Sequence, residues 1–177
     1  MLLLLNNMSP EKYILLDKKV GETPLETLET WRATREDLKG VPMAYAGRLD
    51  PMASGQLLIL IGEECKVQEK YHHLDKEYQV GILFGAHSDS GDVLGIITPH
   101  TTPIIEAAEL NNLLQGMVGT IEFPYPIFSA KTVQGKPLHT WTMENRLHEI
   151  TIPTRKSEIY KLSLDNIKTF SRLEIAE

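Results

Sequence analysis

One acidic residue lies in a segment whose composition could support chemistry on a polar substrate. Asp50 stands within residues 46–55, together with Gly47, Pro51 and Gly55, and the apolar segment 56–62 follows directly. Glycine permits tight backbone geometry and proline fixes φ, so these residues predict an ordered turn around the carboxylate. A carboxylate at the edge of an apolar core is costly unless it is paired or used. Asp50 could therefore act as a nucleophile or a general base, or it could simply cap a turn.

The surrounding pattern resembles the catalytic motif of TruB-type RNA pseudouridine synthases. That motif reads Gly-x-Leu-Asp-Pro-x-Ala-x-Gly, followed by an apolar segment that ends in Leu-Gly-Glu-x-x-Lys. The positions that match in this chain are Gly47, Leu49, Asp50, Pro51, Ala53, Gly55, Gly62, Glu63 and Lys66. The resemblance implies an enzyme that isomerises uridine to pseudouridine in RNA, with the T-loop of tRNA as the expected substrate and Asp50 as the catalytic group.

The same resemblance implies two aromatic residues at the target base. Tyr45 stands where the family usually has a histidine, five residues before the aspartate, and its ring can still stack on a base. Tyr78 matches a family tyrosine that packs on the target uracil. Lys76 and Gly85 match the family residues on either side of that tyrosine. Core packing is the alternative for Tyr78. We expect Tyr45 and Tyr78 to bind the extruded base.

Three basic residues are also candidates for substrate binding. Arg48 lies two residues before Asp50, where sister families use an arginine to fill the gap left by the extruded base; it could also pair with Asp50 or with another loop residue. Lys18 matches the family's opening Asp-Lys-Pro-x-Gly motif and is expected either at the surface or shaping the site. The family has a lysine at the position that Thr132 occupies here, and Lys131 lies one residue before it. In a strand, a displacement of one residue turns the side chain to the other face, so Lys131 could point away from the site.

Two other functions compete with this interpretation. A glycosidase would need two facing carboxylates, and Asp89 or Asp92 could supply the second, although both are expected to brace their own loop. A non-catalytic RNA-binding or chaperone-like relative is the other alternative. The lack of a family arginine motif in the 177 residues and the net charge of −6 favour this relative over an active enzyme. The same net charge counts against broad nonspecific RNA binding, which depends on basic residues that neutralise phosphates, so any RNA contact would need a local basic groove.

The family's next motif, Gly-Thr-Tyr-Ile-Arg, supplies an arginine that pairs with the catalytic aspartate. This motif does not occur in the 177 residues, nor does the PUA domain that many members carry after it. We therefore expect residues 1–177 to be a single pseudouridine synthase-like catalytic domain that is shortened at its C-terminus. The missing arginine leaves the activity in question.

Composition narrows the remaining possibilities. A hydrophobic content of 42% is typical of a globular protein, and a single cysteine, Cys65, excludes an internal disulfide and favours a cytoplasmic location. The apolar run 1–5 is too short to span a membrane. His72 and His73 do not have the spacing of a zinc site, so we expect no metal. The isomerisation that the resemblance implies requires no cofactor, and we expect none. The expected partner is tRNA, bound by a monomer.

The elements that must position these residues predict an α/β (α+β) fold, with a mixed, largely antiparallel sheet flanked by helices. Apolar and alternating patterns predict strands at 12–17, 76–85 and 173–175, and the resemblance to the TruB family implies a further strand at 151–162. Thr23, Pro24 and Glu26 form the signature of a helix start, and that helix is expected to reach about Arg35. A second helix is expected from Pro103, with a C-terminal cap at Gly119.

Overall fold

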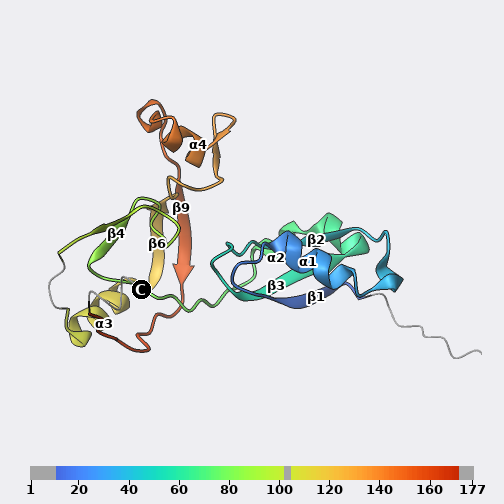
Figure 1. Cartoon of the computed structure of the whole chain (residues 1–177), viewed down its shortest axis with the longest axis horizontal. Coiled ribbons are helices and arrows are strands. Elements are labelled where there is room, and N and C mark those ends of the chain that lie inside the picture. Colours follow the sequence, from blue (N-terminus) through green and yellow to red (C-terminus); the bar gives the residue numbers. More distant parts are fainter. Residues whose placement is uncertain (1–10, 102–104, 172–177) are drawn as a thin grey trace, which may run out of the picture. The chain divides into compact units, whose positions relative to one another are not determined.

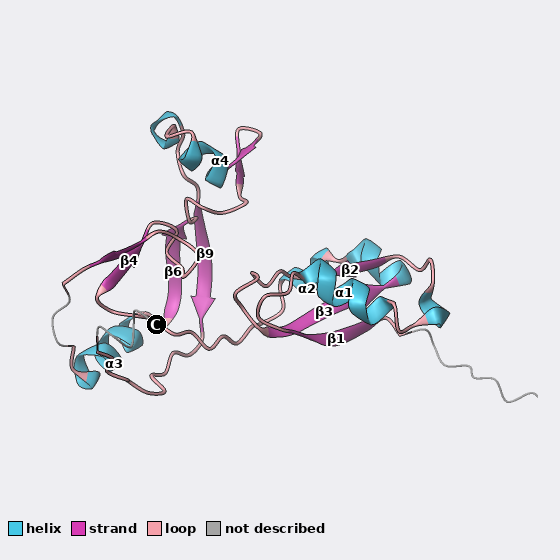
Figure 2. Ribbon diagram, viewed as in Figure 1, coloured by secondary structure: helices cyan, strands magenta, loops and turns pink. Residues whose placement is uncertain are grey.

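A computed structural model of the protein describes residues 11–101 and 105–171 (Figure 1). The chain divides into two compact units, Met1–Gly81 and Ile82–Glu177, and each is described by itself. Every pairing between the described strands is antiparallel, and helices accompany the strands in both units (Figure 2). The α+β class predicted from the sequence is therefore confirmed. The single-domain organisation stays a prediction.

The first unit contains a three-stranded sheet in the order β1-β3-β2. Its strands are β1 (Tyr13–Lys18), β2 (Met43–Tyr45) and β3 (Gly55–Ile61). The central strand β3 is the apolar run after the Asp50 segment, and its last three residues are all buried. Burial of this run gives the sheet its core, as the sequence predicted.

One helix, α1 (Pro24–Arg32), supplies the partner for one face of this sheet. The predicted capping box is present, with Thr23 and Glu26 satisfying each other's backbone N–H groups. Leu28 packs with Leu57 and Ile59 of β3 in the buried cluster, and Trp31 lies at its margin. The helix ends at Arg32, three residues earlier than predicted.

Short helical turns complete the first unit. They are η1 (Glu36–Leu38), η2 (Gly62–Val67) and α2 (Glu69–His72). The tyrosine rings of Tyr13 in β1 and Tyr71 in α2 lie 6.2 Å apart between centroids, so α2 contacts the sheet face opposite α1.

The strand predicted at 76–85 is wrong. Residues 74–83 form no helix or strand, and Tyr78, Val80 and Ile82 are each at least 70% exposed. A strand needs a neighbouring strand to accept and donate its backbone hydrogen bonds, and no neighbour pairs with this segment in the described residues. The alternation of apolar residues was present, but the pairing that makes it a strand was not.

The described residues of the second unit, 82–101 and 105–171, form three antiparallel strand pairs and two α-helices. Its elements are β4 (Ala86–Ser88), β5 (Ile97–Pro99), α3 (Ala107–Gly116), β6 (Gly119–Pro124), β7 (Thr132–Val133), β8 (Lys136–Pro137), α4 (Leu138–Met143), η3 (Leu147–Glu149) and β9 (Thr154–Ile159). Strand β6 pairs with β9 over six residues, and Leu138 and Trp141 of α4 are buried.

Three sequence predictions in this unit have different outcomes. The strand predicted at 151–162 is confirmed in its central part by β9. Gly119 begins β6 instead of capping α3, whose C-cap is Met117. Pro103 and the strand at 173–175 lie outside the described residues, as does the apolar run 1–5 of the first unit.

Candidate active site

The Asp50 segment forms an ordered loop between β2 and β3. The Ala46 N–H donates to the Leu58 carbonyl at 2.8 Å, which extends the β2–β3 ladder by one bond beyond β2. Gly47 has φ +125°, a conformation that residues with a Cβ rarely adopt. The Ala53 N–H donates to the Asp50 carbonyl at 2.9 Å and closes a turn. The sequence around Asp50 therefore has the glycine that its backbone path requires.

Two hydrogen bonds attach this loop to the end of β1. The Lys18 Nζ donates to the Ala53 carbonyl at 2.6 Å and to the Lys19 carbonyl at 3.0 Å. The Gly21 N–H donates to the Pro51 carbonyl at 2.7 Å. These contacts hold Pro51 and Ala53, one and three residues after Asp50, against the end of β1. Asp50 is thus presented on a loop of restricted position.

Lys18 is buried, with only 1% of its surface exposed. It lies opposite Gly55 in the β1–β3 register and on the same face as Leu16 and Ile14, because alternate residues of a strand share a face. The expectation of a solvated surface charge is therefore wrong. A lysine ammonium has three donors, and two of them bind backbone carbonyls here.

A carboxylate lies close to this buried cation. The Glu22 Oε2 accepts from the Lys19 N–H at 2.9 Å and from the Thr27 Oγ1 at 3.0 Å. The hydrogen bond from the Lys19 backbone lowers the pKa of Glu22 most, followed by that from Thr27, and the Lys18 charge also contributes. Glu22 thus adds a negative charge near the buried ammonium, which reduces the cost of holding it.

The side chains of Asp50 and Arg48 are both exposed. No hydrogen bond or ion pair joins either side chain to another residue within 11–101 and 105–171. The pairing of Arg48 with Asp50, and the alternative of an ion pair elsewhere in the loop, are thus absent from this structure. Because Asp50 is exposed, its ionised form does not carry the desolvation cost expected at the edge of an apolar core.

Comparison with known proteins identifies the family to which the chain belongs. Residues 35–176 match the model of the TruB family pseudouridylate synthase, N-terminal domain. The chain belongs to the TruB family. It is 34% identical to tRNA pseudouridine synthase B of Caldicellulosiruptor saccharolyticus over 153 residues, covering 86% of this chain and 51% of that protein.

Other relatives give the same result. The chain is 34% identical to tRNA pseudouridine synthase B of Bordetella avium over 154 residues, covering 85% of this chain and 61% of that protein. For the Syntrophus aciditrophicus protein of the same name, the identity is 30% over 155 residues, which cover 87% of this chain and 48% of that protein. The chain therefore spans about half to three-fifths of the length of these TruB relatives.

The two tyrosines predicted at the base have different surroundings. Tyr45, at the end of β2, packs against the buried cluster of Leu28, Leu57 and Ile59, and its carbonyl accepts a bond of 2.9 Å from the Gln68 Nε2. Its ring is half-buried against the sheet. Tyr78 is 70% exposed in the segment that forms no strand. The structure thus fixes Tyr45 near the start of the Asp50 loop, whereas it gives Tyr78 no such support.

Three predicted residues lie in the second unit. The Lys131 Nζ lies 5.0 Å from the centroid of the Tyr125 ring, and the side chain is exposed. Asp89 accepts a bond from the Ile96 N–H, and Asp92 accepts bonds from the Leu94 N–H and the Ser90 Oγ. The prediction that Asp89 and Asp92 brace their own loop is therefore confirmed.

Within the described residues, no group of three or more His, Cys, Asp or Glu side chains is arranged to hold a metal ion. None of the helices in this part of the TruB chain is long and apolar enough to cross a membrane.

Sequence reasoning did not find the backbone contacts that hold the Asp50 loop. The hydrogen bond from Gly21 to Pro51 joins two main-chain groups, so the residue types in the sequence do not indicate it. The burial of Lys18 could have been found from the sequence, because Lys18 continues the alternation of Ile14 and Leu16 on one face of the strand.

Proposed function

We propose that this protein isomerises uridine to pseudouridine in RNA, with the T-loop of tRNA as its substrate and Asp50 as its catalytic residue. The observation that carries the proposal is the exposed Asp50 carboxylate on a loop that Lys18 and Gly21 tie to the sheet. Membership of the TruB family and the names of the relatives support the reaction and the tRNA substrate.

The chemistry suits a single carboxylate. The bond between the uracil N1 and C1′ breaks, the base rotates, and C1′ bonds to C5. The C5 proton then leaves, and N1 takes up one proton. A carboxylate can act as the nucleophile or as the base in these steps. Atoms and oxidation states are the same in substrate and product, so the reaction by itself requires no cofactor. The substrate is a tRNA in the cytoplasm, bound by a monomer.

The remaining residues take supporting roles. The target base must leave its stack, and contact with aromatic rings repays part of that cost. We assign Tyr45 and Tyr78 to this contact, and Arg48 to the space that the base vacates. Lys18 acts through the loop: its ammonium is occupied by the Ala53 and Lys19 carbonyls, so it positions Asp50 and leaves RNA binding to other residues.

Incubation of the protein with an unmodified tRNA transcript, followed by chemical detection of pseudouridine, tests the proposal. Wild type and the control Glu69→Gln, which removes an exposed carboxylate on α2, should form the product. Asp50→Asn and Asp50→Ala should form none. The proposal is rejected if wild type makes no pseudouridine or if the Asp50 variants make as much as wild type.

The absence of a basic partner for Asp50 in the described residues favours one second candidate, a TruB relative that binds RNA without catalysis. In that case wild type and Asp50→Asn bind the tRNA transcript equally, the affinity falls steeply with salt, and neither forms pseudouridine. The same two measurements therefore separate the candidates.

A further inference from the structure

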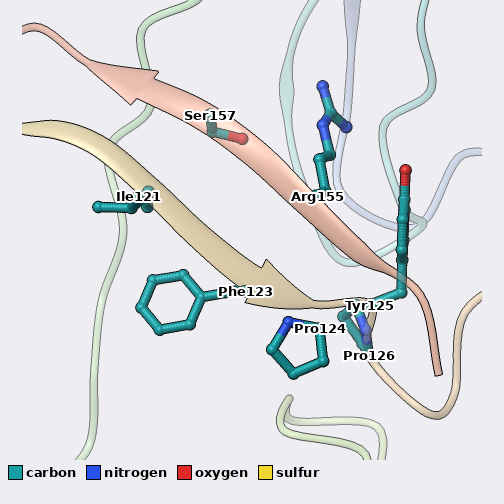
Figure 3. Close-up of a pocket in the computed structure, with 7 residues that line it drawn as sticks. All are labelled: Ile121, Phe123, Pro124, Tyr125, Pro126, Arg155 and Ser157. Carbon is teal, nitrogen blue, oxygen red and sulfur yellow. The ribbon is translucent and has the colours of Figure 1, made fainter. Parts of the chain in front are cut away.

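A pocket of about 290 Å³ opens on the β6–β9 ribbon of the second unit (Figure 3). Seven residues line it: Ile121, Phe123, Pro124, Tyr125, Pro126, Arg155 and Ser157. None of them is acidic, although the chain as a whole carries a net charge of −6. The pocket thus combines aromatic rings with a cation in an acidic protein.

The strand register explains why this face lacks carboxylates. Phe123 lies opposite Arg155, and Ile121 lies opposite Ser157, so these four residues share one face of the ribbon. Glu122 lies opposite Lys156 on the other face, where their side chains form an ion pair at 3.7 Å. The alternation therefore removes the acidic residues of β6 and β9 from the pocket face.

One cation lies at the Tyr125 ring, and a second lines the same pocket. The Lys131 Nζ lies 5.0 Å from the ring centroid, and in Figure 3 the Arg155 side chain on β9 and the Tyr125 side chain just after β6 project in the same direction. No ion pair engages Arg155 or Lys131 in the part of the chain that the structure describes. Tyr125 itself is held by a bond of 3.0 Å from its N–H to the Pro153 carbonyl.

We propose that this pocket binds one unpaired nucleotide of RNA, with the base against the Tyr125 ring and the phosphate held by Arg155 and Lys131. A base stacks on an aromatic ring whatever its identity, and an arginine guanidinium matches the geometry of a phosphate. The inference rests on the proposed function for the identity of the polyanion as RNA. It assigns Lys131, predicted from the sequence to bind substrate, to a contact with a nucleotide at Tyr125.

Fluorescence anisotropy with a labelled tRNA transcript and with a short single-stranded oligouridine tests the site. Tyr125→Leu should weaken binding of both probes about 10-fold, whereas Tyr125→Phe should stay within about 2-fold of wild type, because stacking needs the ring. Arg155→Gln should weaken binding and reduce the slope of log Kd against log salt by about one, the value expected for a single phosphate contact.

Lys156→Gln is the matched control, because it makes the same charge change one residue away on the opposite face of β9. It should leave the affinity within about 2-fold. The inference is overturned if Tyr125→Leu and Tyr125→Phe bind alike, or if Lys156→Gln weakens binding as much as Arg155→Gln. Thermal melts of all four variants establish that the affinities compare folded proteins.

The outcome is separable from that of the proposed function. Pseudouridine formed by wild type while the four variants bind RNA equally would refute the nucleotide site and leave the catalytic proposal intact. A loss of binding in Tyr125→Leu and Arg155→Gln, with no pseudouridine from wild type, would support the site and refute catalysis.

Discussion

Replacement of Lys18 by methionine tests whether the buried cation positions the Asp50 loop. Methionine retains an unbranched apolar side chain in a site that is 1% exposed, and it removes the ammonium that binds the Ala53 and Lys19 carbonyls. The Gly21 to Pro51 bond remains, so the loop keeps one of its two ties to the end of β1. We expect the loop to keep its path and to move over a wider range.

The expected effect on stability is small compared with the interactions removed. Each hydrogen bond from a charged donor contributes about 1.5–3 kcal/mol, so the two bonds of Lys18 represent about 3–6 kcal/mol. A buried ammonium also carries a desolvation cost of several kcal/mol, which methionine does not have. We therefore expect the free energy of unfolding to fall by only about 1–2 kcal/mol.

The expected effect on catalysis is larger. A displacement of about 1 Å at a reacting group can reduce a rate by about 100-fold. Single-turnover pseudouridine formation on the tRNA transcript should therefore slow by about 10- to 100-fold in Lys18→Met, with the Kd for tRNA within about 2-fold of wild type. Hydrogen exchange of the Ala53 amide, which closes the Asp50 turn, should become faster.

Lys19→Met is the control, because Lys19 is the exposed neighbour and its ammonium has no hydrogen bond within the described residues. It should change neither the rate nor the exchange of the Ala53 amide. A Lys18→Met protein with a raised Kd and an unchanged single-turnover rate would show that Lys18 contacts RNA directly. Unchanged exchange at Ala53 would show that the loop does not depend on the ammonium.

Two further predictions concern backbone conformation and pH. Gly47→Ala places a Cβ at φ +125° and should lower the free energy of unfolding by about 1–3 kcal/mol in urea titrations, with reduced pseudouridine formation. The hydrogen bond from Lys136, at 2.6 Å, lowers the pKa of Glu144 from its ordinary 4.5. A folded-state pKa below the unfolded one gives stability that is present above pH 4.5 and is lost as pH falls through the folded value. The melting temperature should therefore fall below about pH 4.5, and Glu144→Gln should flatten that decline; an unchanged pH profile would contradict the ion pair.

Local signals in the sequence were enough for the elements that depend on neighbouring residues. The capping box of Thr23 and Glu26 forms within four residues, and the burial of β3 follows from an uninterrupted apolar run. The strand at 76–85 failed for the opposite reason. Its alternation was local, but its backbone bonds depend on a distant partner that the sequence does not name, and Tyr78 lost its support with it.

The pocket on β6 and β9 could not be predicted, because it depends on the register between segments more than 30 residues apart. Arg155 faces the same side as Phe123 only because these two residues are paired. A shift of one residue would place Lys156 beside Phe123 and turn Arg155 toward the acidic face. The sequence gives the alternation within each strand, and the structure supplies the pairing.

Lys18 shows how the Asp50 loop and a basic residue more than 30 positions away become one structural unit. The predicted strand 12–17 stopped one residue short of Lys18, whereas β1 continues to it, and the alternation of Ile14 and Leu16 then places Lys18 on the buried face. A lysine on a buried face requires acceptors, and the acceptors nearest in register belong to the chain just before Gly55. The charge on β1 and the turn around Asp50 are thus mutually dependent: the turn satisfies the ammonium, and the ammonium restrains the turn. Weakening the turn with Gly47→Ala and removing the ammonium with Lys18→Met should therefore have effects on the free energy of unfolding that do not add, and strict additivity in a double-mutant cycle would refute the dependence.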